Sequence, residues 1–111
     1  MTTTDYSAVI LPQAEQDITE ILDYIAVNLK NPSAAKNLWT DIKEAIARAK
    51  AFPYAMPTLK NEKITLGKEY RRLDVNNYVL IYKVNECKKE ICIFAVFYAP
   101  SNVIAKVLNR I

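Results

Sequence analysis

The sequence contains no histidine and a single glycine, Gly67, among its 111 residues. Without an imidazole, no serine–histidine or cysteine–histidine pair and no histidine-ligated metal centre can be built. One glycine also excludes the dinucleotide-binding and P-loop motifs, because these need several glycines for a close backbone approach to phosphate. Any polar chemistry must therefore come from other side chains, such as lysine, arginine and tyrosine.

Cysteine and long hydrophobic runs are equally scarce. Cys87 and Cys92 lie five residues apart, without a CxxC motif or surrounding carboxylates, so they are expected to be reduced core or hairpin residues. We expect no metal ion and no cofactor. The first five residues lack the pattern of a signal peptide, and no apolar run approaches the length that crosses a bilayer. The sequence therefore predicts a cytoplasmic protein without membrane contact.

The length and the hydrophobic content of the chain are typical of one small domain. A chain of 111 residues with 51% hydrophobic content can close one core, so residues 1–111 are predicted to form a single domain. The net charge of +3 and the pI of about 8.8 fit a polyanion or an acidic protein as partner, but they are also ordinary for a soluble protein.

Two amphipathic helices are predicted after a short strand at residues 6–11. Pro12 fits the first turn of the first helix, where its missing N–H has no partner to lose. This helix extends to about Leu29, with acidic residues on one side and an apolar stripe made of Ala14, Ile18, Ile21, Leu22, Ile25 and Leu29. Asn31-Pro32 interrupts the pattern, and Ser33 is predicted to cap the second helix. The apolar stripe of that helix is Ala35, Leu38, Ile42, Ala45, Ile46 and Ala49.

Trp39 lies one step off this second stripe, so it either flanks the core or faces a partner. A loop is predicted over residues 53–68, because Pro53 and Pro57 both disfavour helix. Long loops of this kind carry function about as often as they serve as mobile tethers.

Three strands are predicted to follow at residues 70–75, 78–84 and 90–98, each rich in β-branched or aromatic residues. Asn76 and Asn77 suit a tight hairpin turn, since asparagine tolerates positive φ. Pro100 ends the last strand, and Ser101 is predicted to cap a short C-terminal helix. The expected fold class is α+β in the order β-α-α-β-β-β-α, with a helical hairpin packed on a small, mainly antiparallel sheet.

The segment from Tyr70 to Val84, YRRLDVNNYVLIYKV, is similar to the central hairpin of the RelE/ParE superfamily of toxins. That hairpin often reads as an arginine, a leucine, a valine, a turn and a Tyr-x-x-x-Tyr strand. Further likeness lies in the strand at residues 91–98, the Trp39 helix, its Phe52-Pro53 exit and the spacing of Ala14, Asp17, Ile18, Ile21, Tyr24 and Ile25. The resemblance covers nearly the whole chain.

The resemblance implies the toxin of a type II toxin–antitoxin system (plasmid stabilisation family), a growth inhibitor neutralised by a cognate antitoxin. ParE-like members inhibit DNA gyrase and need no nuclease site. RelE-like members are metal-independent endoribonucleases that cut messenger RNA in the ribosome. A third possibility is an inactive protein that keeps the toxin fold as an interaction module.

If the chain is a nuclease, its catalytic candidates are Lys68, Arg71, Arg72 and Tyr98. RNA cleavage without metal requires a group that activates the 2′-hydroxyl, cations that stabilise phosphoryl charge and a proton donor for the leaving oxygen. Five basic residues fall between Lys60 and Arg72, against Glu62 and Glu69. They form either a phosphate-binding patch or a solvated loop surface.

Arg71 matches the family's arginine ahead of the leucine, and it is the first candidate for a functional side chain. The alternative is a salt bridge to an acidic residue on the first helix. Strand alternation places Arg71 with Leu73 and Val75, and Arg72 with Tyr70 and Asp74 on the other face. Tyr78 and Tyr82 share a face and could stack on bases, but Leu80 between them favours a core position.

The sequence departs from the ribonuclease pattern at two places. Val79 stands where ribonuclease members commonly carry an arginine after the first tyrosine of the hairpin's second strand. Residues 98–102, YAPSN, lack the basic residues that usually follow the last strand. Because losing phosphate-stabilising cations costs orders of magnitude in rate, the ParE-like mode is favoured over the nuclease.

Overall fold

The computed structural model describes residues 6–59 and 69–110, so Lys68 and the rest of the predicted basic loop segment lie outside it. The elements in chain order are β1 (Ser7–Ile10), α1 (Pro12–Asp23), η1 (Tyr24–Asn28), α2 (Pro32–Ala51), β2 (Arg71–Val75), β3 (Tyr78–Asn85), β4 (Glu90–Tyr98) and α3 (Val103–Arg110). This order confirms the predicted α+β class and the predicted succession of strands and helices.

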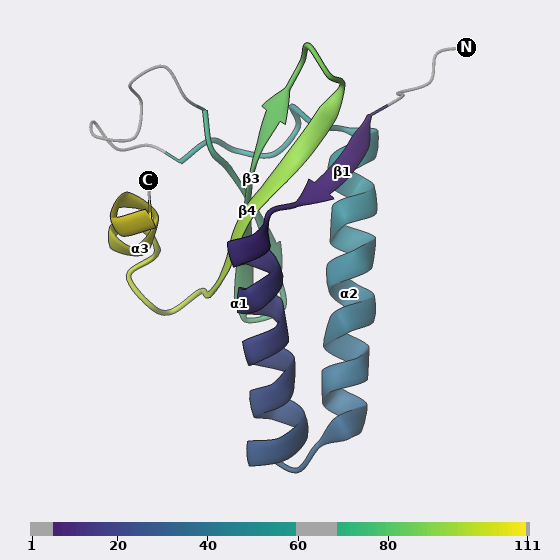
Figure 1. Ribbon diagram of the computed structural model, residues 1–111, viewed down its shortest axis with the longest axis vertical. Helices are drawn as coiled ribbons and strands as arrows, with labels where there is room; N and C mark the ends of the chain where they lie inside the picture. Colours follow the sequence, from purple (N-terminus) through teal and green to yellow (C-terminus); the bar gives the residue numbers. More distant parts are fainter. Residues whose placement is uncertain (1–5, 60–68, 111) are drawn as a thin grey trace.

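The sheet has four strands in the order β1-β4-β3-β2 (Figure 1). β2, β3 and β4 form the expected antiparallel meander, while β1 pairs parallel with β4 from Ser7 opposite Glu90 to Ile10 opposite Ile93. The prediction of a mainly antiparallel sheet is confirmed. Because β1 ends beside Ile93, the last part of β4 has a strand neighbour on one side only, which is β3.

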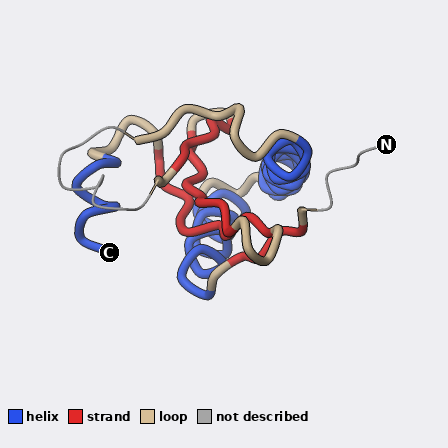
Figure 2. Tube along the Cα trace, turned by 90° about the horizontal axis from the view of Figure 1, so that it is seen from above, coloured by secondary structure: helices blue, strands red, loops and turns tan. Residues whose placement is uncertain are grey.

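Helices α1 and α2 cover one face of the sheet, and α3 lies on the other face (Figure 2). The larger core lies under the helical hairpin and includes the fully buried Ile42, Leu80, Tyr82 and Ile93. The smaller core lies under α3 and includes Val79, Ile81 and Val107. Strand β3 therefore carries buried residues on both faces, as a central strand between two layers does.

The turns of the meander follow the sequence. Asn76 adopts a φ of 56°, which confirms the tight turn predicted for Asn76-Asn77. Its side-chain nitrogen also donates a 2.9 Å hydrogen bond to Asp41 Oδ2 on α2. The β2–β3 hairpin is thereby fastened to the helical layer.

A bulge interrupts the pairing of β3 with β4. Ile81 pairs with Ala95 and Tyr82 with Ile93, so Phe94 has no partner in the register. Leu80 and Tyr82 are fully buried in the core under the helices, and Tyr78 is partly buried against the same core. The core position predicted from the sequence is confirmed for Tyr82, whereas Tyr78 lies at the edge of the core.

Both predicted helix caps are wrong by one or two residues. Asn31, and not Ser33, caps α2: its Oδ1 accepts a 3.1 Å hydrogen bond from the Ala34 amide, and Pro32 occupies the first turn. Asn102, and not Ser101, caps α3 by accepting from the Ala105 amide. In both cases a nearby asparagine satisfies a free amide of the first helical turn.

The first helix does not run regularly to Leu29. Its last part is the π-helical segment η1, closed by a hydrogen bond from the Leu29 amide to the Tyr24 carbonyl. A π-helical turn holds more residues than an α-helical turn, so it rotates the following side chains away from the stripe. Leu29, predicted as core, is 56% exposed for this reason.

Candidate functional site

Arg71, the first candidate for a functional side chain, points into the protein. Its side chain is 12% exposed and its guanidinium donates hydrogen bonds to the carbonyl oxygens of Met56, at 2.7 Å, and Tyr54, at 3.3 Å. It also forms an ion pair with Glu69 and lies over the Tyr54 ring. The alternative of a bridge to the first helix is wrong: Arg71 fastens the segment that follows α2 to the sheet.

Arg72 lies on the opposite face of β2, as predicted from strand alternation. Leu73 and Val75 share the helix side with Arg71, whereas Tyr70 belongs to the core under α3. The Arg72 side chain is 37% exposed and pairs with Asp74 at 3.0 Å. The two arginines therefore cannot act together on one phosphate from one side.

Tyr98 lies at the far end of the sheet from Arg71. In the strand register, Tyr98 is opposite Tyr78, which is opposite Val75, while Arg71 is opposite Tyr82. Four residues along β2 and two strands across place Arg71 and Tyr98 on the order of 15 Å apart. The described nuclease candidates are thus not brought into one centre, and the fourth, Lys68, is outside the described residues.

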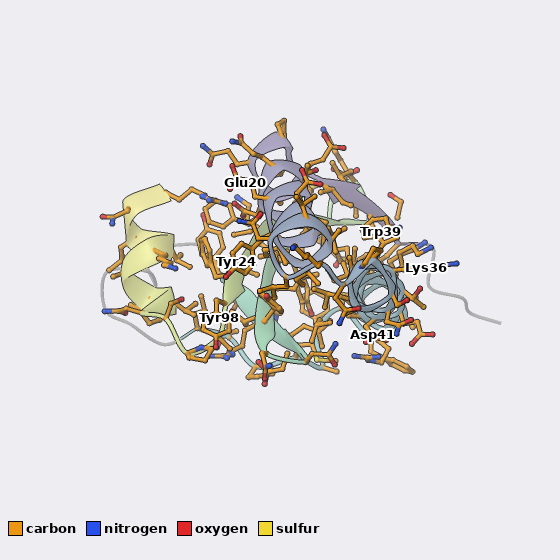
Figure 3. All side chains as sticks on the ribbon, turned by 90° about the horizontal axis from the view of Figure 1, so that it is seen from below. Glu20, Tyr24, Lys36, Trp39, Asp41 and Tyr98 are labelled. Carbon is orange, nitrogen blue, oxygen red and sulfur yellow. The ribbon has the colours of Figure 1, made fainter. Side chains whose placement is uncertain are left out.

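Tyr98 instead borders a groove between the helical hairpin and the end of β4 (Figure 3). The groove has a volume of about 620 Å³, and we call it the tyrosine groove; its lining residues come from α1, η1, β3, β4 and α3. Its aromatic and aliphatic lining includes Tyr24, Tyr78, Tyr98, Ile21 and Leu29.

The three tyrosines of the groove lie close together. The rings of Tyr78 and Tyr98 meet edge to face with centroids 5.7 Å apart. Burial, with smaller contributions from Tyr98 and Tyr24, raises the pKa of the Tyr78 hydroxyl. Tyr24, Leu29 and Tyr98 are each at least half exposed, so this apolar surface is open to solvent. Clustered tyrosines with free ring faces are typical of protein-binding surfaces.

One wall of the groove is acidic. The charged residues of α1 are Glu15, Asp17, Glu20 and Asp23, and the helix carries no basic residue. Asp17 and Glu20 line the groove, and the basic Lys106 of α3 lines it as well. Gln16 donates a 3.0 Å hydrogen bond to Glu20. In the described ranges, none of the ion pairs engages Glu20.

Asp17, which lines the groove, connects α1 to α3 and β4 through hydrogen bonds. Its carboxylate accepts two hydrogen bonds from Arg110 on α3, at 2.7 and 3.0 Å, and one from the Val96 amide on β4 at 3.1 Å. The Val96 amide lies where β1 no longer covers β4, so Asp17 takes the place of a strand partner there. Asp17 and Arg110 thereby join both helical layers at the groove.

A second polar cluster lies at the opposite end of the sheet. Tyr6 and Tyr54 each donate a 2.6 Å hydrogen bond to Glu86 Oε1, and Lys89 pairs with Oε2 of the same carboxylate. Hydrogen bonds from Lys89, Tyr54 and Tyr6 lower the pKa of Glu86 to about 2. The bond to Glu86, with desolvation second, raises the pKa of Tyr54 to about 12. This cluster fastens β1 and the segment after α2 to the β3–β4 turn.

Trp39 flanks the core, which is one of the two positions that the sequence left open. It is partly buried against the core cluster under the hairpin and carries Lys43 over its ring, with the ammonium 5.5 Å from the centroid. Trp39 also lines a hollow of about 440 Å³ between α1 and α2, together with Ile18, Leu22 and Ala35. This hollow is separate from the tyrosine groove.

Sequence reasoning found Tyr98 but missed its neighbours Glu20 and Leu29. The lack of any basic residue on α1 was a usable signal for the acidic wall. The exposure of Leu29 had no such signal, since it depends on the π-helical turn. Over residues 6–59 and 69–110, no helix is long and apolar enough to span a membrane, and no group of three potential metal ligands is present.

Comparisons with known proteins agree on the fold. The family model for the ParE toxin of the type II toxin–antitoxin system parDE matches residues 8–100. No curated protein matches the sequence. Among solved structures, the chromosomal ParDE system of P. aeruginosa matches with a TM-score of 0.66 and 22% identity, over 84% of this chain and 95% of that one.

Two RelE-type structures are similar as well. The archaeal RelE–RelB complex of Pyrococcus horikoshii OT3 has a TM-score of 0.58 and 18% identity, over 85% of this chain and 94% of that one. The RelBE2 toxin–antitoxin complex of Mycobacterium tuberculosis has a TM-score of 0.53 and 16% identity, over 84% of this chain and 96% of that one. At these identities the structural likeness establishes the shared fold.

Proposed function

The chain belongs to the ParE toxin family of type II toxin–antitoxin systems, and on this premise we propose that it inhibits growth by binding and blocking DNA gyrase. A cognate antitoxin holds it inactive. The family assignment leaves the cellular target open, because the same fold also serves RelE toxins. The choice of target rests on the chain's own residues.

The observation that carries the proposal is the dispersal of the candidate nuclease side chains. Acid–base catalysis needs its groups within hydrogen-bonding reach of one reacting centre. Arg71 is engaged with Met56, Tyr54 and Glu69, Arg72 faces the other side of the sheet, and Tyr98 lies at the far end. A toxin that acts by binding does not require these groups to meet.

Val79 supports the same conclusion. It is fully buried in the core under α3, so a side chain at this position points away from solvent and from any substrate. Position 79, where ribonuclease members commonly carry an arginine, therefore supplies no cation to a substrate in this chain.

Solved structures of relatives support the antitoxin as partner. The structures from P. horikoshii and M. tuberculosis are complexes of a toxin with its antitoxin. The exposed apolar side chains of this chain, among them Tyr24, Val27, Leu29 and Tyr98, offer a surface that such a partner would cover.

The proposal is tested by controlled expression of the chain with and without its co-encoded antitoxin. Growth and message integrity are followed together, the latter by primer extension on abundant messages. We expect slowed growth without discrete cuts, and recovery when the antitoxin is present. Discrete cuts would identify a ribosome-dependent endoribonuclease instead. Unchanged growth would contradict toxin activity. The chain would then be an inactive protein that keeps the toxin fold as an interaction module.

A further inference from the structure

We propose that the hollow between α1 and α2, which contains Trp39, docks a second copy of this chain, so that the free protein forms a two-fold dimer through its helical hairpin. We call this hollow the tryptophan hollow. The inference goes beyond the proposed function and does not depend on it, because it concerns the chain without antitoxin or target. It is carried by two walls of opposite charge on either side of an apolar floor.

The floor of the tryptophan hollow offers apolar surface to a partner. Ile18, Leu22, Ala35 and Trp39 line a volume of about 440 Å³, and Trp39 lies between the two helices (Figure 3). Its side chain packs against the core but is only partly buried. A tryptophan in this position has a large apolar area left to cover, and this residue type is enriched among those that dominate protein interfaces.

The two walls of the hollow carry opposite charges. Glu15 and Asp23 line it from α1, and Lys36 lines it from α2. Lys43 of α2 lies beside them, with its ammonium 5.5 Å from the centroid of the Trp39 ring. All four charged side chains are exposed, and among the described residues none of the ion pairs engages them. They are therefore available to a partner.

The other charges of the hairpin do not change this arrangement. Asp17 and Glu20 of α1 line the tyrosine groove, and Asp41 of α2 accepts a hydrogen bond from Asn76 at the β2–β3 turn. The remaining charged residues of the two helices and their connection do not line the hollow; they are Lys30, Glu44, Arg48 and Lys50. The charge at the hollow thus comes from carboxylates on α1 and lysines on α2.

The hollow is complementary to a copy of itself. Because the helices run antiparallel, Asp23 and Lys36 lie toward the connection of the hairpin, and Glu15 and Lys43 lie farther from it. The two carboxylates are eight residues apart on α1, about 12 Å, and the two lysines are seven residues apart on α2, about 11 Å. The spacing on one wall therefore matches the spacing on the other.

A two-fold axis parallel to the helices uses this match. It places α1 of each copy over α2 of the other, so that Lys36 meets Asp23 and Lys43 meets Glu15, and each contact occurs twice. The apolar floors, with Trp39 in each, then face one another between the charged pairs. Two helical hairpins packed in this way form a four-helix arrangement.

Other occupants fit the two walls less well. A two-fold axis across the helices would stack α1 on α1 and bring carboxylate against carboxylate, which is unfavourable. A nucleic acid would bring phosphates against Glu15 and Asp23. An antitoxin segment would need both signs of charge at the same spacing, which this chain already provides.

The test is sedimentation velocity of the purified chain alone over a range of concentrations. Glu15→Lys and Lys43→Glu are the test variants. Glu44→Lys and Lys88→Glu are the matched controls, because both residues are exposed and neither lines the hollow. Thermal melts establish that each variant is folded. Trp39 is the only tryptophan of the chain, so its fluorescence reports on the hollow directly.

We expect the unmodified chain to dimerise as its concentration rises, with a shift of the Trp39 emission to shorter wavelength. Each test variant should associate at least about tenfold more weakly, because like charges then meet twice in the dimer, and the controls should differ by less than about threefold. An equimolar mixture of Glu15→Lys and Lys43→Glu should recover association to within about threefold of the unmodified chain. In that mixture each copy meets opposite charges in the other.

Recovery on mixing requires that the pair lies between two copies, so failure to recover would overturn the proposal. A chain that stays monomeric at every concentration would overturn it as well. Equal association of all variants would place the dimer contact on another surface and contradict the use of the hollow. A Trp39 emission that shifts only when antitoxin is added would assign the hollow to the antitoxin instead. None of these results decides whether the chain inhibits gyrase, which is measured separately.

Discussion

Arg71 donates a 2.7 Å hydrogen bond to the carbonyl oxygen of Met56, which ties the first residue of β2 to the segment that follows α2. The buried hydroxyl of Tyr82 reaches the same segment by donating to the Pro53 carbonyl at 2.7 Å. Arg71, the first candidate for a functional side chain in the sequence, therefore holds this segment in place.

Replacing Arg71 with alanine should lower the free energy of unfolding by about 1–3 kcal/mol, because two carbonyl oxygens lose a charged donor in a largely buried position. Chemical denaturation measures the loss. Arg72→Ala is the control, and its exposed pair with Asp74 should be worth less than about 1 kcal/mol. Equal effects of the two substitutions would contradict the structural role of Arg71.

The pair of Asp17 and Arg110 should couple the helical layers measurably. Arg110→Ala should cost about 1–3 kcal/mol, since it leaves a carboxylate that is 14% exposed without its cation. A double-mutant cycle with Asp17→Asn separates the pair from other contacts of each residue. A coupling energy indistinguishable from zero would show that α3 is held by apolar contacts alone.

Glu86 should give the chain a distinct response to acid. Its pKa in the folded chain is about 2, below the ordinary value of 4.5, so the folded state binds the proton more weakly than the unfolded state. The contribution of this cluster is present above pH 4.5 and is lost as the pH falls toward 2. Carbon-13 NMR of the Glu86 carboxyl should show a midpoint near 2. A midpoint near 4.5 would contradict the cluster.

Tyr54 should respond at the opposite end of the pH scale. Its pKa of about 12 lies above the ordinary 10, so the stabilising bond is present below pH 10 and is lost as the pH rises through 12. In the variant Glu86→Gln, the pKa of Tyr54 should return toward 10, because the negative acceptor is gone. NMR of the Tyr54 ring carbon follows this titration, and no change on substitution would refute the link.

Local patterns predicted much of this fold. Alternation along β2 placed Arg71 and Arg72 on opposite faces, and the tolerance of asparagine for positive φ located the turn at Asn76. These features depend on neighbours in the sequence, so they can be read from it. The same applies to the buried faces of α1 and α2.

The site was harder to predict, because it depends on relations between distant elements. The tyrosine groove exists because β1 stops beside Ile93 and because the π-helical turn exposes Leu29. Neither feature has a local signature. The inward direction of Arg71 likewise depends on carbonyl groups that lie 15 and 17 residues earlier in the chain.

The proposed action on DNA gyrase, by binding and without a nuclease centre, is tested most directly by supercoiling of relaxed plasmid with purified gyrase in the presence of the purified chain. We predict that supercoiling is inhibited, that added antitoxin restores it, and that Arg72→Ala inhibits as well as the unmodified chain. Full supercoiling in the presence of excess folded chain would contradict the account.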